Sequence, residues 1–297
     1  MMQSNRLLLI LFAAGLVMIG CDNSTDPSDT GTETLDEDVA VAVAGFLSED
    51  GGGMTDQLED VSFLASGTGL QFTVAPDGAM LKGSSTVADT SYDDATGWWT
   101  GTMTRNRTSL LGLYESHFER VYQFQFLNSA GQPQRRYIVQ TANGSDTAHT
   151  INFKVLSGTG YHRSPIRVHY LESMTADWVI TQANTPILMI NGTSSRSGKD
   201  TLTTRESVRT HANSLSTTLI NVTKPRYRLG ATRDDISGTV MGTYNAEITF
   251  TRGDLYRERT VQKDFTVELS GDEAQIGIGG RRFRIGWKRG EFFGSMR

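Results

Sequence analysis

The stretch YQFQF at residues 122–126 decides the fold of this chain, because aromatic and polar side chains alternate there at every position. Successive side chains of an extended strand point to opposite faces, so a period of two indicates a strand with one buried face. The same alternation recurs in IRVHY at residues 166–170 and in FTVEL at residues 265–269. In 166–170 it predicts a buried Tyr170 and an exposed His169.

Turn signals separate these alternating runs. Asp77-Gly78, Asn143-Gly144, Gly253-Asp254 and Gly279-Gly280 all lie between apolar stretches, where dipeptides of this kind form hairpin turns. About a dozen strands at short spacing, with no helices between them, argue against a parallel sheet. We therefore predict a mainly β body that forms an antiparallel meander. A closed barrel, a sandwich and a strongly curved half-barrel all remain open.

Two short helical patterns precede the strands. Thr34 begins a capping box, and apolar residues then recur on one helical face until Gly51-Gly52-Gly53. A second pattern begins near Thr55 and stops at Gly67. Together they predict a helical hairpin whose apolar faces are too small for an independent core, so it should pack on the sheet.

The chain begins with a leader pattern. Met1 to Arg6 form a short basic start, Leu7 to Ile19 an unbroken apolar run, and Gly20-Cys21 a small residue followed by the single cysteine. An apolar run of this length spans roughly 20 Å as a helix, against about 30 Å of bilayer hydrocarbon, so it is too short to span a membrane. It matches the apolar region of a cleavable signal peptide.

The segment MIGC at residues 18–21 resembles the lipobox of a bacterial lipoprotein signal peptide, with Met18 where leucine is commonest. The resemblance covers residues 1–21 only. It implies cleavage before Cys21, a lipid anchor on that sulfur, and a place in the cell envelope. The outer membrane is favoured over the inner one, and the side of the membrane that the body faces stays open. Nucleic acid is not expected as a partner outside the cytoplasm. Because Cys21 is the only cysteine, the body cannot form an internal disulfide.

Charge is distributed unevenly along the chain. Residues 22–100 hold sixteen carboxylates and one lysine, so 1 − 16 = −15, whereas residues 101–297 hold 26 basic and 17 acidic residues, so 26 − 17 = +9. The acidic excess starts directly after Cys21, in a stretch with almost nothing to bury, which is typical of a disordered tether. The predicted organisation is therefore a signal peptide (1–20), an acidic tether (21–33), a helical hairpin (34–66) and an antiparallel β domain (67–297).

The last strands carry the strongest candidate binding surface. Basic residues there alternate with apolar ones, which predicts one buried face and one basic face that could bind an anionic or amphipathic envelope ligand. The alternative is that these charges protect edge strands from pairing with other chains. The candidate residues are Arg252, Arg257, Arg259, Arg282, Arg284 and Lys288.

Catalytic signatures are missing from the sequence: it contains neither a GxSxG elbow nor an HExxH motif. His162 and His169 are the closest histidines, but an odd separation puts them on opposite faces if one strand holds both, and Pro165 could break that strand. We therefore predict no catalytic residue, no metal site and no cofactor. Two function classes remain: a non-enzymatic structural or ligand-binding envelope protein, and an envelope glycan or lipid hydrolase acting through carboxylates.

Overall fold

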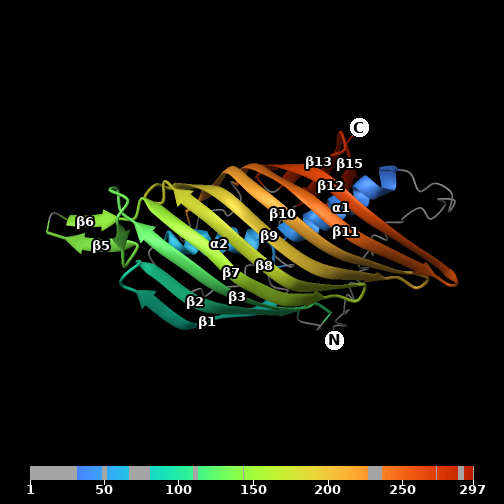
Figure 1. Ribbon diagram of the computed structural model, residues 1–297, viewed down its shortest axis with the longest axis horizontal. Coiled ribbons are helices and arrows are strands. Elements are labelled where there is room, and N and C mark those ends of the chain that lie inside the picture. Colours follow the sequence, from blue (N-terminus) through green and yellow to red (C-terminus); the bar gives the residue numbers. More distant parts are fainter. Residues whose placement is uncertain are drawn as a thin grey trace, which may run out of the picture.

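The protein is built around one long, curved antiparallel sheet with two helices along its concave face (Figure 1). The computed structural model describes residues 32–48, 52–66, 81–109, 113–142, 144–226, 236–271, 273–286 and 291–296. The predicted signal peptide, the predicted tether up to residue 31, and Lys288 lie outside these residues.

Fifteen strands are present in the described part of the chain, and the helices precede all of them. The helices are α1 (Thr32–Leu47) and α2 (Met54–Leu64). The strands are β1 (Leu81–Asp93), β2 (Trp98–Ser109), β3 (Glu115–Leu127), β4 (Pro133–Gln134), β5 (Ile138–Thr141), β6 (Gly144–Thr147), β7 (Thr150–Arg163), β8 (Arg167–Thr181), β9 (Ile187–Thr203), β10 (Val208–Pro225), β11 (Ser237–Arg252), β12 (Leu255–Ser270), β13 (Glu273–Ile278), β14 (Arg281–Gly286) and β15 (Glu291–Ser295).

The main sheet is a meander in the order β1-β2-β3-β7-β8-β9-β10-β11-β12-β13-β14-β15, with β4 paired to the end of β3. Strands β5 and β6 form a separate hairpin. Every pairing is antiparallel, so the predicted mainly β antiparallel meander is confirmed. The sheet does not close, because β1 and β15 remain its two edges. Of the three alternatives, the curved open sheet with helices on its concave face is the one observed.

The alternating stretches form strands as predicted, and two of them bury the expected face. Tyr122, Phe124 and Phe126 of β3 are buried, as are the apolar residues of 265–269 in β12. Aromatic side chains on neighbouring strands then pack together, as Tyr122 does with Phe153 of β7 at 5.3 Å between ring centroids. The concave face of the sheet is therefore the core of the molecule.

The prediction for residues 166–170 was wrong about which face is buried. His169 is only 4% exposed, whereas Tyr170 is 42% exposed on the outer face. The inward position is stable for His169 because Asp200 on the neighbouring strand β9 accepts a hydrogen bond from it. Pro165 does separate two strands, and His162 of β7 lies directly opposite His169 in the register.

The two helices follow one another along the concave face instead of forming a side-by-side hairpin (Figure 1). Helix α1 packs on β13, β14 and β15, whereas α2 lies farther along the concave face. Helix α1 begins at Thr32, so Thr34 lies inside the helix and the predicted capping box is wrong. Helix α2 begins after Gly53 as its N-cap residue.

Two glycines let the chain pass between the helices. Gly52 has a φ of +62°, and a Cβ there would lie 2.6 Å from the ring of Phe118 on β3. A Cβ on Gly53 would lie 1.9 Å from the carbonyl oxygen of Phe46 in α1. Gly52 needs glycine because of its positive φ, and neither residue has room for a Cβ atom. The pair therefore fixes where α1 ends and α2 begins.

Candidate functional site

Helix α2 fills the concave face with charged residues. All eleven of its residues are buried, and Asp56 and Asp60, one turn apart, are fully buried. Arg105 of β2 contacts both carboxylates, with Nη1 2.7 Å from Oδ1 of Asp56 and Nη2 2.8 Å from Oδ1 of Asp60. Arg120 of β3 also reaches both, at 3.3 Å and 3.7 Å. These pairs connect α2 to two neighbouring strands.

Two further side chains hydrogen-bond to the carboxylates of this cluster. Arg107 lies 3.0 Å from Asp56, and the Tyr122 hydroxyl donates to Asp60 at 2.6 Å. Burial alone would raise the pKa of Asp56, but Arg105, Arg107 and Arg120 together hold it well below its usual range. Burial also raises the pKa of Tyr122, so its phenol keeps the proton that it donates. Every group in the cluster is engaged in holding α2.

A second buried network surrounds Asp200 on β9. Its carboxylate accepts hydrogen bonds from Arg167 at 2.7 Å, from Nδ1 of His169 at 3.1 Å and from Asn213 at 3.0 Å. Burial lowers the pKa of His169 to about 4, so the ring is neutral at pH 7, with Nδ1–H donating to Asp200. The other ring nitrogen, Nε2, accepts a hydrogen bond from Arg196 at 2.5 Å. Both nitrogens are occupied, so His169 is not available as a catalytic base.

Arg196 connects this network to α1. Its guanidinium lies 5.5 Å from the ring centroid of Phe46, and the side chain is only 4% exposed. Burial lowers its pKa to about 10, because the nearby Asp200 does not fully offset the cost of removing the charge from water. Nε and Nη1 of Arg196 have no hydrogen-bond partner among the described residues. Among the described residues, Arg196 therefore contacts α1 through the cation–π interaction alone, and its one hydrogen bond goes to His169 of β8.

The outer face carries a groove with a volume of about 1060 Å³ across β8 to β14. The strand register aligns its side chains into two rows, since Thr193 faces Thr218 and Ser195 faces Ser216 across β9 and β10. The row that contains Ser195 bears hydroxyl groups on four of its five side chains, and Asp264 ends it. The row that contains Thr193 alternates less regularly, with three threonines among Asp177, Met241, Gly277 and Arg282. We call this the outer groove; its outward-facing residues are Thr175, Asp177, Thr193, Ser195, Ser216, Thr218, Met241, Thr243, Asp264, Thr266, Gly277 and Arg282.

The carboxylates of the outer groove are too far apart for glycoside hydrolysis. Asp177 on β8 and Asp264 on β12 are separated by four strand spacings, or about 19 Å, whereas that chemistry needs roughly 5 to 9.5 Å. Asp177 is paired with Lys154 at 3.3 Å, and Asp264 accepts a hydrogen bond from Thr243 at 2.7 Å. Within the described ranges, no group of three or more His, Cys, Asp or Glu side chains is arranged to hold a metal ion.

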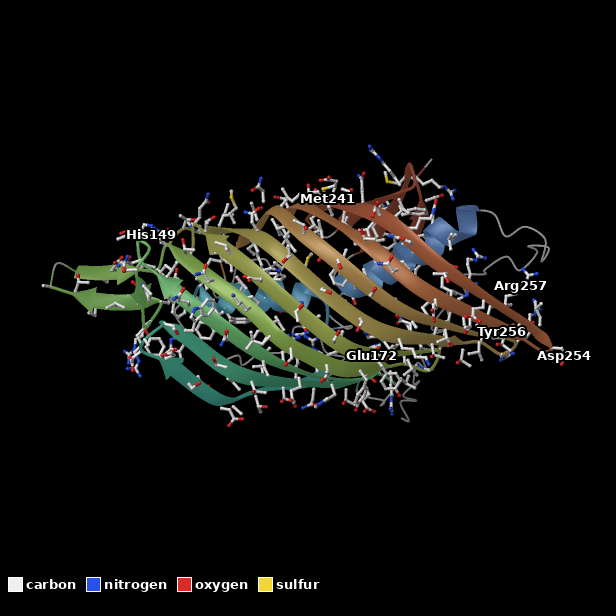
Figure 2. The ribbon with its side chains drawn as sticks, in the orientation of Figure 1. His149, Glu172, Met241, Asp254, Tyr256 and Arg257 are labelled. Atoms are coloured by element: carbon white, nitrogen blue, oxygen red, sulfur yellow. The ribbon has the colours of Figure 1, made fainter. Side chains whose placement is uncertain are left out.

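The basic residues singled out from the sequence fall into two separate groups. Arg252, Arg257 and Arg259 lie at the exposed tip of the β11–β12 hairpin, where Figure 2 shows Arg257 beside Asp254 and Tyr256. Arg282 and Arg284 lie on β14. Thr266 of β12 pairs with Gly277 of β13, which pairs with Arg282 of β14, so Arg282 lies level with Thr266. Arg259 is seven positions before Thr266 on β12, so the two groups are about 23 Å apart along the strand direction.

The two buried networks and the outer groove could not be found from the sequence alone. Asp56 and Asp60 have helical spacing, but their partner Arg105 is 45 positions farther along the chain. The hydroxyl rows did leave a signal, since Ser and Thr occupy alternate positions in 193–197 and 214–218. Only the register, however, aligns those positions across the strands.

Comparison with known proteins gives no assignment: no family model, no curated protein and no solved structure matches this chain. Among the described helices, neither is both long and apolar enough to cross a bilayer.

Proposed function

We propose that the protein is a cell-envelope lipoprotein, anchored in a membrane through a lipid on Cys21, whose folded body is a non-enzymatic binding module. The outer groove is its contact surface. A polar ligand rich in hydroxyl groups, such as an envelope glycan, is the ligand class that fits this surface best. The single observation that carries the proposal is the groove itself, which is lined by aligned hydroxyl side chains.

The filled concave face supports a polar ligand over an apolar one. A curved sheet could hold a lipid only if its concave side were vacant, but α2 is buried there along its whole length. The small apolar cavity beside α2, lined in part by Leu64, Tyr122 and Phe153, has a volume of about 10 Å³. One water molecule needs about that much space, so an acyl chain does not fit this cavity.

The composition of the outer groove matches a hydroxyl-bearing chain. A Ser or Thr hydroxyl both donates and accepts hydrogen bonds, so rows of them complement a ligand whose own groups do the same. Strands repeat about every 4.8 Å, and consecutive rings of a sugar chain repeat on a similar scale. Asp177 and Asp264 add acceptors, and Met241, 47% exposed, adds an apolar contact. These features provide orientation and specificity without a reactive group.

The ligand proposal is tested with the mature chain, residues 21–297 carrying Cys21→Ser, on an array of bacterial envelope glycans followed by calorimetry with any hit. Thr193→Val and Thr218→Val remove facing hydroxyls from the groove floor with little change in side-chain shape. Each lost hydrogen bond should weaken binding about 2- to 10-fold. Thr260→Val, at an exposed position of β12 outside the groove, is the matched control and should bind as the parent does.

Two results would contradict this proposal. One is a glycan hit whose affinity is unchanged by both groove substitutions, because the ligand would then bind elsewhere. The other is the absence of any glycan hit. The lipid anchor is tested separately, by intact mass measurement of the full chain purified from membranes. An N-terminus at Cys21 with the added mass of a diacylglycerol supports the anchor, and an unmodified Cys21 overturns it.

A further inference from the structure

The anchored end of the chain enters the folded body beside its last strands, if the proposed lipid on Cys21 is present. Helix α1 packs on β13, β14 and β15. Near its start, Asp36 pairs with Lys263 at 2.9 Å and lies against Gly279 in the β13–β14 turn. Residues 22–31 separate Cys21 from α1, and ten residues span at most about 36 Å. The last strands are therefore tied within that distance of the bilayer surface.

The outer side of β14 and β15 combines positive charge with exposed apolar side chains. Arg282 and Arg284 both point outward from β14, and Arg284 is 53% exposed. Its guanidinium lies 5.5 Å from the ring centroid of Phe293, which is itself 49% exposed. Met296, just after β15, is 45% exposed. We call Arg282, Arg284, Phe293 and Met296 the β14–β15 surface.

The sequence around this surface is strongly basic. Residues 281–297 contain six basic residues and one carboxylate, so 6 − 1 = +5. The nearest described acidic partner of Arg284 is Glu273 at 3.9 Å, and both side chains are more than half exposed. An ion pair so long and so exposed is weak, so it leaves the arginine able to bind another anion.

We propose that the β14–β15 surface rests on anionic phospholipid headgroups of the same bilayer that holds the lipid on Cys21. Arginine side chains are attracted to an anionic lipid surface, and aromatic side chains are favoured at the boundary between headgroups and acyl chains. The acidic tether is repelled by that surface, but its length lets the body approach. The contact therefore orients the body that the lipid on Cys21 holds at the membrane.

The arginines at the β11–β12 tip provide a matched comparison. Arg257 and Arg259 are exposed and equally basic, yet they lie about 23 Å from Arg282 along the strand direction. Tyr256 at the tip is itself 60% exposed, so the feature that distinguishes the β14–β15 surface is its place on the strands against which α1 packs. If positive charge alone determined the contact, both pairs of arginines would bind lipid headgroups equally. The proposed contact instead uses only the arginines of the β14–β15 surface, which lies beside the anchored end.

The experiment measures sedimentation of the non-lipidated mature chain, residues 21–297 with Cys21→Ser, with vesicles of phosphatidylglycerol and phosphatidylcholine or of phosphatidylcholine alone. This chain keeps every described element. We expect binding to the anionic vesicles that weakens at high salt. Arg282→Glu with Arg284→Glu should reduce the affinity at least about tenfold. Phe293→Ser should reduce it less, and Arg257→Glu with Arg259→Glu should leave it unchanged.

Three outcomes would overturn the inference: no binding to anionic vesicles, equal binding to phosphatidylcholine alone, or equal loss in the two double variants. Circular dichroism of each variant shows whether it has kept its sheet. If the β14 double variant fails to fold, Arg282→Gln and Phe293→Ser as single changes carry the same test. The outcome is independent of the anchor, because an unmodified Cys21 would overturn the proposed function without affecting vesicle binding by this surface.

Discussion

Replacing Asp56 by asparagine should destabilise the protein by about 3 to 5 kcal/mol, because it removes one charge from a buried network and leaves its partners in place. Three arginines contact this carboxylate, at 2.7, 3.0 and 3.3 Å. Once Asp56 is neutral, Asp60 remains as the only described carboxylate in ion-pair contact with Arg105 and Arg120. The loss is a large fraction of the 5–15 kcal/mol that keeps most domains folded.

The assay is urea unfolding at pH 7, followed by circular dichroism, with Glu206→Gln as the control. Glu206 also pairs closely with an arginine, Arg252, at 2.5 Å, but both side chains are more than half exposed. Its loss should therefore change the free energy of unfolding by no more than about 1 kcal/mol. If the two substitutions cost the same, or if Asp56→Asn costs under about 1 kcal/mol, then the buried network does not hold α2.

The pH dependence gives an independent check on Asp56. Its pKa in the folded protein lies below the value of 3.8 for a free side chain, because three arginines favour the charged form. The folded state thus binds fewer protons than the unfolded state in this range, and the stabilisation is complete above pH 4. It is lost as the pH falls below 4. Asp56→Asn should therefore show a shallower loss of stability in acid than the parent protein.

Three further predictions concern single residues. The ring of His169 should show no NMR titration between pH 5 and 8, because its pKa is lowered to about 4. The stability linked to His169 is present above the free value of 6.5 and is lost as the pH falls toward 4, and His169→Gln should remove this slope in urea unfolding. Arg196→Met should leave the unfolding temperature equal or raise it, because Arg196 buries a charge with two of its three guanidinium nitrogens lacking a hydrogen-bond partner; a fall of several degrees would contradict this. Gly53→Ala should cost on the order of 1–3 kcal/mol, because the new Cβ would meet the Phe46 carbonyl. Gly131→Ala, where no atom lies within 4 Å, should cost about 1 kcal/mol or slightly more, from backbone strain alone.

The strand content of the fold could be predicted from local sequence, because a period of two records which residues face the core. This works where the inward residues are apolar, as in 122–126, whose aromatic side chains are all buried. It failed in 166–170, because the residue that supports an inward His169 is Asp200, about thirty positions farther along the chain. A local pattern contains no information about such a partner, so a polar residue that will be buried cannot be told from one that will be exposed.

The same limit applies to the candidate site. Helix α2 was predicted to have one apolar face, yet its polar residues are buried too. Their partners Arg105 and Arg120 lie on β2 and β3, which come later in the sequence, so the pattern of α2 alone does not show them. The two groups of arginines in the last strands share an alternating pattern in sequence, but a long hairpin separates them in space. Distances of this kind depend on strand length and register, which the pattern of side chains does not determine.

The division between the two faces of the sheet limits what this fold can recognise. An open curved sheet normally exposes two vulnerable features, an apolar concave face and unpaired edges. Here α1 and α2 cover the concave face, and the carboxylates of α2 satisfy arginines that would otherwise be buried without partners. Recognition is then left to the outer face, where hydroxyl side chains form the groove, and to the last strands, where cationic and apolar side chains lie beside the start of α1. If α2 were displaced by a ligand, binding would have to break at least four buried ion pairs, which makes the outer surface the less costly place to bind.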